Sequence, residues 1–550
     1  MAGIAIFADI FGVDQNPGWS RARIGLLFFG VLITSCAVLY YLYAEKLNST
    51  AHKIQCAVKN LPIHYFTFPV AFIVILIYVW LGSSGKWHTW KPSTYYYDNL
   101  AKGFLSAHFY LPIEPDPRLL LLPNPYDLAA RVGIEVPLDL SFYKGKFYMY
   151  WEPVPALIII AIKYFRQGRI SDSHLAFGFV CGTFLAQFFL MVALWRRFFY
   201  NLPKWTLPIS LLLAGLAGPE IFMRHNYDAA KIYEAAITGG QFFLMCGFLA
   251  LYYAMIKPSP SWKLLVLTGS LWALAIGTRL ILVIPVGAMT LTACCFVGIS
   301  NGWEFKNVKK LIPLALPLVL GLASLGWYNW VRFGSLTETG FYYHLAGWDV
   351  RKYSHEIFSP IYIFQNFYNS FFHPFSVQSN FPFINMEAGV TKTIISSISL
   401  PGGYVAQPIT GILWLFPYVI FSFVPLLILF KERFYRKKSH NAVNNDEQNL
   451  LNWISLSLIV SFMSSFGVTL LFLRSAMRFS DDFLPSLMLV SIIGFWQGCR
   501  LLERKPLINR LYFIFGAILA SASILLSTLL AISTNSGLVK FIIQRFSFLP

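Results

Sequence analysis

The stretch YYYDNLAKGFLSAHFYLP, residues 95–112, follows the apolar run HYFTFPVAFIVILIYVWLG at 64–82 and begins the polar part of a long segment, 83–173. The segment continues as NPYDLAARVGIEVPLDLSFYKGKFYMYWEPVPAL, residues 124–157, before the next long apolar run. Unpaired backbone groups and charges are too costly in hydrocarbon, so this segment must lie outside the bilayer. We therefore expect a structured loop that carries the function of a membrane protein.

The composition indicates a polytopic α-helical membrane protein. Of the 550 residues, 57% are hydrophobic and only 12% are charged, whereas a soluble domain carries about a quarter charged residues. Apolar runs of about twenty residues, the length that spans a bilayer, recur from end to end. The chain does not begin with a short apolar run and a small-residue cleavage site, so we expect no removable signal peptide.

The apolar runs predict about twelve transmembrane helices in an all-α fold. They cover approximately residues 24–44, 64–82, 174–195, 205–222, 235–256, 263–277, 280–300, 311–329, 406–430, 450–473, 483–499 and 511–533. The predicted division is two N-terminal helices in 1–82, a long outer loop at 83–173 that we expect to carry the function, helices three to eight in 174–330, a second long outer loop at 331–405, and four helices in 406–550.

The net charge of +18 indicates how the helices are oriented in the membrane and does not indicate nucleic-acid binding. Basic residues collect in short loops such as KERFYRKK, 431–438, and the positive-inside rule places such loops in the cytoplasm. Both long loops then face the outside. No basic stripe with interleaved aromatic residues lies outside the apolar runs, so we expect the lipid bilayer, and not nucleic acid, as a partner.

One apolar segment decides the side on which every later loop lies. PVPALIIIAIKYF, residues 153–165, is about thirteen residues long, shorter than the roughly seventeen that a transmembrane helix needs. We interpret it as an interfacial or re-entrant helix that closes the first outer loop. If it crossed the membrane, all later loops would change sides.

The first outer loop has recognisable local patterns. Residues 95–110 have the apolar spacing of a short amphipathic helix, on which Asp98 and Lys102 are four positions apart. Such a pair is ordinarily a surface ion pair. Asp127 is placed to cap a short helix that ends near Arg131.

A β-hairpin is predicted next. Residues 138–143 and 146–150 alternate in character around Lys144-Gly145, which is a typical turn pair. Asp139 lies on the first strand of this hairpin. The hairpin alone indicates a scaffold and no particular chemistry.

These motifs together resemble the GT-C superfamily of integral-membrane glycosyltransferases, in particular a poorly characterised bacterial branch. The resemblance covers most of residues 83–500. It rests on YYDNLAKGFL (96–105), NPYDLAAR (124–131), DLSFYKGKFYMYWEPVPAL (139–157), AIGTRL (275–280), WYNWVRFGSLTETGFYYHLAG (327–347) and RSAMRFSDDFLP (474–485).

The resemblance implies transfer of a sugar from a polyprenyl-phosphate donor to a glycan, lipid or protein acceptor at the outer face of the bacterial cytoplasmic membrane. It places Asp98 at the position of the catalytic carboxylate, which would take a proton from the acceptor hydroxyl. The neighbour of Asp98 is Asn99, where many relatives have a second acid. A second carboxylate would then come from Asp127, Asp139 or Glu152, and the sequence does not choose among them. The Trp-Trp-Asp signature of oligosaccharyltransferases is absent, so we do not expect transfer of a whole glycan to asparagine.

Cations must hold the negative charge of the leaving phosphate. Lys102 and Glu152 are further candidates for binding substrate. Five arginines at predicted outer helix ends or in outer loops suit the phosphate, although interfacial anchoring explains such arginines equally well. They are Arg131, Arg224, Arg279, Arg332 and Arg478. No cofactor is certain; a divalent metal ion is possible, but the histidines lack ligand spacing.

Three other functions remain open. A transporter or flippase for lipid-linked saccharides would place ionisable residues within its helices, and these apolar runs are nearly free of charge. A polymerase that joins lipid-linked repeat units would differ in transferring a whole unit. A non-catalytic receptor or assembly subunit would transfer no sugar. The sequence identifies neither the sugar, the acceptor, the carrier lipid nor the oligomeric state.

Overall fold

The computed structural model describes residues 62–87, 94–137, 139–218, 232–256, 259–302, 304–347, 349–392, 400–436 and 446–546. Within them, eight helices are long and apolar enough to cross a membrane. With their short 3-10 extensions they cover His64–Gly82, Asp172–Phe198, Ile232–Met255, Leu280–Ser300, Lys309–Phe333, Asp446–Leu470, Leu484–Leu501 and Pro506–Ser533. The expected polytopic α-helical class is confirmed. The predicted helix at 24–44 lies outside the described residues.

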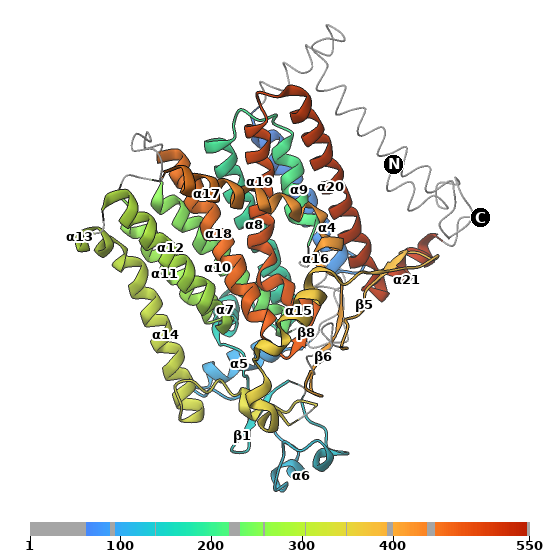
Figure 1. Cartoon of the computed structure of the whole chain (residues 1–550). Helices are drawn as coiled ribbons and strands as arrows, with labels where there is room; N and C mark the ends of the chain where they lie inside the picture. The colour runs from blue at the N-terminus through green and yellow to red at the C-terminus, as the bar shows by residue number, and fades with distance from the viewer. Residues whose placement is uncertain are drawn as a thin grey trace.

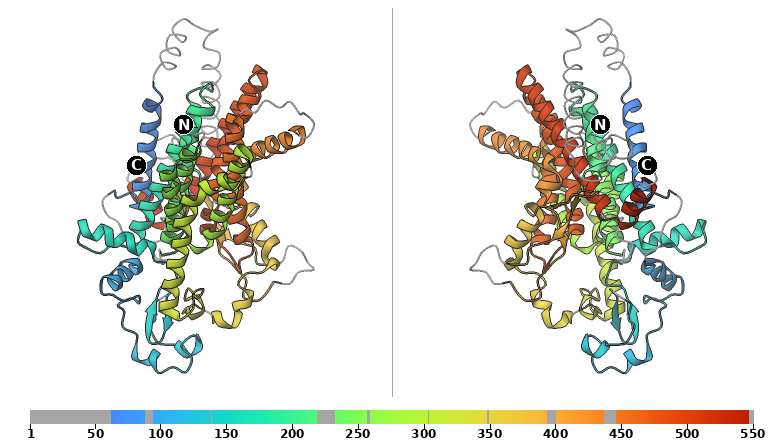
Figure 2. Two further views of the ribbon diagram at one scale, coloured as in Figure 1. Left: turned by 90° about the vertical axis from the view of Figure 1, so that its left-hand side faces the viewer. Right: turned by 90° about the vertical axis from the view of Figure 1, so that its right-hand side faces the viewer.

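The long helices form one bundle, and the loop elements gather at one end of it (Figures 1 and 2). The helices are α4 (His64–Gly82), α8 (Asp172–Phe198), α10 (Ile232–Met255), α12 (Val283–Asn301), α14 (Ile312–Phe333), α18 (Asp446–Leu470), α19 (Leu484–Leu501) and α20 (Pro506–Ser533). Helices α10 and α19 are the most completely buried of the eight, whereas α14 is mostly exposed at the edge. An exposed apolar edge is what a helix in contact with lipid requires.

Small residues bring some of these helices into close contact. Helix α11 (Trp262–Ile276) packs on α14 where Gly269 faces the carbonyl of Leu314, and a Cβ atom at 269 would collide with that carbonyl. Gly494 on α19 meets the carbonyl of Phe421 in the same way. Close backbone approach at small residues is a common means of packing helices in membranes.

Several shorter helices complete the bundle. Helix α9 (Thr206–Leu216) packs beside α4 and α20, and α21 (Ser536–Phe546) follows α20. The expected short apolar helix is present as α7 (Val154–Phe165). It lies across the direction of the long helices, coloured teal in Figure 2. Its twelve residues are too few to span a bilayer.

The first loop contains the expected helix and hairpin. The helix is α5 (Tyr96–Leu105), and it is followed by α6 (Pro117–Leu120) and the 3-10 helix η1 (Ala129–Arg131). Strands β1 (Ser141–Tyr143) and β2 (Lys146–Tyr148) pair antiparallel. Lys144 and Gly145 both have positive φ, 46° and 73°, as a tight hairpin turn demands.

The start of α5 is capped by a residue from far along the chain. The carboxylate of Asp172, at the start of α8, accepts hydrogen bonds from the backbone N–H groups of Tyr96 (3.0 Å) and Tyr97 (3.2 Å). It also accepts from the Thr94 hydroxyl at 2.6 Å. A carboxylate at a helix N-terminus satisfies amides that lack partners within the helix. This contact fixes α5 against the bundle.

The second loop is a set of short elements between α14 and α17. Those before residue 400 are η5 (Phe341–Tyr343), η6 (Val350–Glu356), η7 (Pro360–Tyr362), α15 (Ile363–Phe371), β3 (Ser376–Val377), β4 (Ile384–Asn385) and β5 (Glu387–Ala388). Strand β3 pairs with β4. The remaining short elements elsewhere are η3 (Leu280–Leu282), α13 (Phe305–Val308), η4 (Lys309–Leu311) and η9 (Met477–Asp482).

The predicted continuous helix over 406–430 is wrong. That segment contains β6 (Val405–Ala406), β7 (Pro408–Ile409), α16 (Ile412–Leu415) and η8 (Pro417–Ser422), and the regular helix α17 occupies Phe423–Arg436. Strand β7 pairs with β5, and β6 pairs with β8 (Arg474–Ser475). Pro408 and Pro417 cannot donate the backbone bonds of a helix interior. Apolar composition alone therefore gave a wrong prediction of the secondary structure of this segment.

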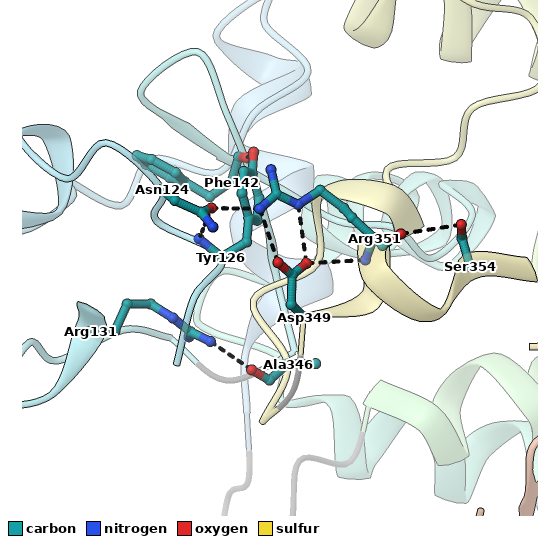
Figure 3. Close-up of polar contacts among 8 residues, drawn as sticks. All are labelled: Asn124, Tyr126, Arg131, Phe142, Ala346, Asp349, Arg351 and Ser354. Atoms are coloured by element: carbon teal, nitrogen blue, oxygen red, sulfur yellow. Dashed lines mark hydrogen bonds and ion pairs between the residues drawn. The ribbon is translucent and has the colours of Figure 1, made fainter. Parts of the chain in front are cut away.

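The two long loops are joined to each other at the loop end of the bundle. The backbone N–H of Leu345 donates to the carbonyl of Leu140 at 2.9 Å. Figure 3 shows a second junction, in which Arg351 donates to the Asn124 side chain at 2.5 Å and pairs with Asp349 at 3.1 Å. We call Asn124, Tyr126, Asp349 and Arg351 the loop clamp. The Arg351 guanidinium also stacks 4.0 Å from the ring centre of Tyr126.

Candidate active site

A cavity of about 400 Å³ lies where the two loops meet the helix ends. Five segments distant in sequence line it, and all but the one with Tyr233 contain part of a motif noted in the sequence. Its lining is Tyr150, Trp151, Glu152, Tyr233, Arg279, Leu280, Ile281, Thr337, Thr339, Phe341, His344, Ile357, Phe358, Val468, Thr469, Phe472, Leu473, Arg474, Arg478, Phe479 and Asp482. The volume lies in the range of small-molecule sites.

One wall of the cavity carries buried charge. Arg279, which immediately precedes η3, donates from Nε to Asp482 Oδ1 at 3.1 Å and from Nη2 to Oδ2 at 2.7 Å. The same guanidinium lies 5.4 Å from the ring centre of Trp151. Two parallel hydrogen bonds of this kind hold an arginine in one orientation. The pair therefore presents a fixed charged surface to the cavity.

Two further arginines contribute to this wall from the segment that connects α18 to α19. Arg478 on η9 stacks 4.7 Å from the ring centre of Tyr233, and its Nε is buried with no hydrogen-bond partner in the described part of the chain. Arg474 lies on β8, and burial lowers its pKa from the ordinary arginine value. An arginine N–H without a protein acceptor is available to an anionic ligand.

Glu152 is a buried carboxyl group at the cavity surface, between Trp151 and the start of α7. Burial raises its pKa to about 7, although hydrogen bonds and the positive charges of Arg279 and Arg332 oppose the rise. A carboxyl group with a pKa near the working pH is suited to take up or give up a proton. Glu152 is therefore the titratable group best placed for proton transfer in this cavity.

Asp139 does not line the cavity, but it contacts residues that do. Its backbone φ is +59°, a conformation that aspartate tolerates better than most residues. The carboxylate lies 3.4 Å from Nε2 of His344, which lines the cavity. Burial would raise the pKa of Asp139, but the hydrogen bonds from His344 and Tyr233 outweigh it and hold that pKa below its usual value. Asp139 is thus ionised and orients two groups that face the cavity.

Much of the remaining lining of the cavity is apolar. It includes Ile357, Phe358, Val468, Phe472, Leu473 and Phe479. The amide of Asn366 on α15 holds the segment after α18 by donating to the carbonyls of Leu470 (3.0 Å) and Phe472 (2.7 Å). The side chain of Phe358 is 53% exposed. The cavity lining consequently combines charged groups with hydrocarbon-like surface.

Asp98 does not line this cavity. Its carboxylate has no exposed surface and pairs with Lys163 at 2.8 Å and with Lys102 at 3.3 Å. The backbone N–H of Ile170 is a third donor, at 3.2 Å. Burial raises the pKa of Asp98, but the two lysines and this N–H bring it below the ordinary value. The pair with Lys102 is as predicted. The spacing of residues along α5 did not indicate Lys163, because it lies on another helix, α7.

The remaining predicted site residues lie apart from the cavity lining. Asp127 accepts a hydrogen bond from the N–H of Ala129 at 3.1 Å and so caps η1, as predicted. Arg131 donates to the carbonyl of Ala346 at 2.7 Å. Arg332 is buried beside Tyr328, 3.8 Å from its ring centre, and donates to the carbonyl of Met149 at 2.5 Å. Arg224 lies outside the described residues.

The structure thus brings Glu152, Arg279 and Arg478 together, with Asp139 behind them. The sequence did not single out other members of the same cavity, which are Trp151, Tyr233, His344 and Arg474. Their signal was present in the motifs FYMYWEPVP, FYYHLAG and RSAMRFSDD. In the described part of the chain, no three His, Cys, Asp or Glu side chains lie close enough together to hold a metal ion.

Comparisons with known proteins give distant structural similarity. No protein-family model and no curated protein matches the sequence. Among solved structures, the oligosaccharyltransferase of Archaeoglobus fulgidus matches with 15% identity and a TM-score of 0.47 over 86% of this chain, and the chain spans 56% of its length. The protein O-mannosyltransferase Pmt1-Pmt2 complex of S. cerevisiae, bound to its sugar donor, matches with 10% identity and a TM-score of 0.41 over 87% of this chain and 92% of that chain. At these scores we base the proposed function on the chemistry of the cavity.

Proposed function

We propose that this protein is an integral-membrane glycosyltransferase of the GT-C type. It transfers one sugar from a polyprenyl-phosphate donor to an acceptor hydroxyl at the outer face of the bacterial cytoplasmic membrane. The observation that carries the proposal is the mixed lining of the cavity. Three arginines, a carboxyl group with a pKa of about 7 and many apolar side chains line a volume of about 400 Å³.

The charged and the apolar lining residues suit the phosphate and the prenyl chain of such a donor. The phosphate of a polyprenyl-phosphate sugar is anionic, and Arg474 and Arg478 offer it charge-assisted hydrogen bonds. The prenyl chain is hydrocarbon, and Phe358, Phe472 and Leu473 offer it apolar surface. The cavity is near the small end of the range for ligand sites, which favours a single sugar over a whole repeat unit.

The transfer requires one proton acceptor and a stabilised leaving group. The acceptor oxygen attacks the anomeric carbon from the side opposite the phosphate, and the carboxylate of Glu152 removes the hydroxyl proton. The bond between the anomeric carbon and the phosphate oxygen breaks, and its electron pair leaves with polyprenyl phosphate. Arg478 and Arg474 stabilise that charge. The configuration at the anomeric carbon is inverted.

This scheme changes the base that the family resemblance suggested. Asp98 is buried outside the cavity lining, and its charge is balanced by two lysines. Glu152 faces the cavity and has a pKa suited to proton transfer near neutral pH. In the same scheme, Asp139 orients His344 and Tyr233 and does not react.

The test is transfer of radiolabelled sugar from a panel of polyprenyl-phosphate monosaccharides, with purified protein in lipid vesicles. We expect transfer by the wild type, a loss of about 10²- to 10⁴-fold in Glu152→Gln, and a smaller loss in Asp98→Asn. Absence of transfer from every donor would overturn the proposed activity. Movement of the labelled lipid across the vesicle membrane without transfer would indicate a flippase instead.

A further inference from the structure

A second cavity, of about 610 Å³, lies at the end of the bundle opposite the candidate active site. Helix α18 shows the separation, because Thr469 lines the first cavity and Gln448 lines the second. These positions are about 30 Å apart at the rise of an α-helix. The lining is Val424, Leu427, Ile428, Lys431, Glu432, Gln448, Leu451, Gln497, Gly498, Arg500, Leu501, Leu502 and Tyr512.

Two cations stand at the rim of this cavity. Lys431, on α17, and Arg500, on α19, are both exposed. The carboxylate in the lining, Glu432, accepts a hydrogen bond from the amide of Asn452. The sequence continues after Lys431 with further basic residues in KERFYRKK. The local charge therefore favours an anion.

Two polar groups in the lining of the cavity have no hydrogen-bond partner among the residues that the structure describes. Gln497 is 4% exposed, and its Oε1 is buried and unpaired. The hydroxyl of Tyr512 is also buried and unpaired. It lies against Gly498, where any side chain would collide with it. Buried polar groups without partners are costly, so these two groups point to a polar ligand.

The surroundings of the cavity are hydrocarbon-like. Leu427 and Leu501 line it and are 67% and 66% exposed. Leu511, on the neighbouring turn of α20, is 59% exposed. A ligand in this cavity would thus have a polar part among Lys431, Arg500 and Tyr512 and an apolar part along the leucines.

We propose that this cavity binds the headgroup of an anionic phospholipid in the leaflet at that end of the bundle. The phosphodiester would accept hydrogen bonds from Lys431, Arg500 and the Tyr512 hydroxyl, and a hydroxyl of the headgroup would donate to Oε1 of Gln497. The acyl chains would lie along Leu427 and Leu501. Basic pockets between transmembrane helices bind anionic lipid headgroups in this manner. The site is separate from sugar transfer, so its failure would leave the proposed reaction unaffected.

The experiment measures lipid retention and thermal stability of the full-length protein. Delipidated protein is placed in nanodiscs of phosphatidylcholine alone, or of phosphatidylcholine with one-fifth phosphatidylglycerol, and bound lipid is counted by native mass spectrometry. The test variant is Lys431→Gln/Arg500→Gln. The matched control is Lys309→Gln/Lys310→Gln, which removes two exposed cations at the same end of the bundle. A third variant, Gln497→Leu, removes the buried amide without changing charge.

We expect the wild type and the control to retain phosphatidylglycerol and to melt at a higher temperature with it. The test variant should bind it roughly 30-fold more weakly, at about fivefold for each basic residue. Equal retention by the test variant and the control would overturn the site. Stabilisation by inorganic phosphate alone, lost in the test variant, would show a free-phosphate site and overturn the lipid assignment. If the test variant does not fold, Gln497→Leu decides: unchanged retention overturns the proposal and reduced retention supports it.

Discussion

Arg279 and Asp482 are 203 positions apart in the chain, yet their side chains meet in the bundle through two parallel hydrogen bonds of 3.1 and 2.7 Å. This buried pair joins the turn between α11 and α12 to the segment before α19. It fixes two of the segments that line the candidate active site. Its strength decides whether the cavity keeps its shape.

We predict that Asp482→Asn and Arg279→Ala each destabilise the protein strongly. Removing one partner of a buried ion pair leaves an uncompensated charge, at a cost of about 3–5 kcal/mol. The melting temperature in detergent is the measurement. Arg197→Ala is the control, because the side chains of its pair with Glu447 are 29% and 55% exposed and the pair should contribute about 1 kcal/mol or less. Equal losses in the buried-pair and control variants would contradict the prediction.

Activity should depend on pH through Glu152. Its pKa of about 7 means that the base is protonated below neutrality, so the transfer rate should fall about tenfold for each pH unit below 7. Arg279→Gln removes a charge that lowers this pKa and should move the acid limb to higher pH. The measurement is kcat against pH for wild type and Arg279→Gln. An acid limb that does not move, or that lies near pH 4, would assign the base elsewhere.

Stability should change with pH through the same residue. The pKa of Glu152 is higher in the folded state than in the unfolded state. Between about pH 4.5 and 7 the folded protein therefore holds this proton more tightly than the unfolded chain does. Its destabilising effect is fully present above pH 7 and disappears as pH falls toward 4.5. Glu152→Gln should therefore raise the melting temperature relative to wild type at pH 8 and not at pH 4.5. A difference between the two proteins that is independent of pH would refute this origin.

Asp98→Asn should weaken the attachment of α5 to α7 while leaving the chemistry largely intact. Both lysine contacts lose their carboxylate partner, so we expect a lower melting temperature with kcat reduced by less than tenfold. A general base contributes about 10²- to 10⁴-fold. A loss of that size in Asp98→Asn, without a change in melting temperature, would restore Asp98 as the base and remove Glu152 from that role.

The loop clamp should hold the two long loops together. Arg351→Ala removes the hydrogen bond to Asn124, the ion pair with Asp349 and the stacking on Tyr126 (Figure 3). We expect amide hydrogen exchange in residues 124–131 and 349–354 to be about tenfold faster. Arg118→Ala is the control, because Arg118 is exposed and its ion pair with Asp116 lies within its own turn. Unchanged exchange in Arg351→Ala would show that the backbone contacts alone hold the two loops together.

The sequence predicted the local elements of the first loop well, because their signals are local. The spacing of α5, the cap at Asp127 and the Lys144-Gly145 turn each depend on a few neighbouring residues. The short length of α7 followed from counting residues. The segment 406–430 was misread because its strands pair with distant partners, β5 and β8, which no local pattern reveals.

The candidate site was only partly predictable for the same reason. Glu152, Arg279 and Arg478 were recognisable as charged residues near predicted helix ends. Their assembly depends on contacts across hundreds of residues, such as the pair between Arg279 and Asp482. The role expected for Asp98 did not take Lys163 into account. Lys163 lies on α7 and contacts Asp98 only in the folded loop. A carboxylate and its neutralising partners must be seen together before its chemistry can be assigned.

The charged lining of the cavity and much of its apolar lining belong to different stretches of the chain. The arginines and Glu152 lie at 152, 279 and 474–478, whereas Ile357, Phe358, Val468, Phe472 and Leu473 lie at 357–358 and 468–473, and Asn366 supports the latter stretch. In the proposed function, substitutions at Phe358 or Val468 should therefore alter which carrier lipid is accepted while Glu152 and the arginines stay in place. Divergence or deliberate redesign could then change the preferred lipid without changing the charged groups.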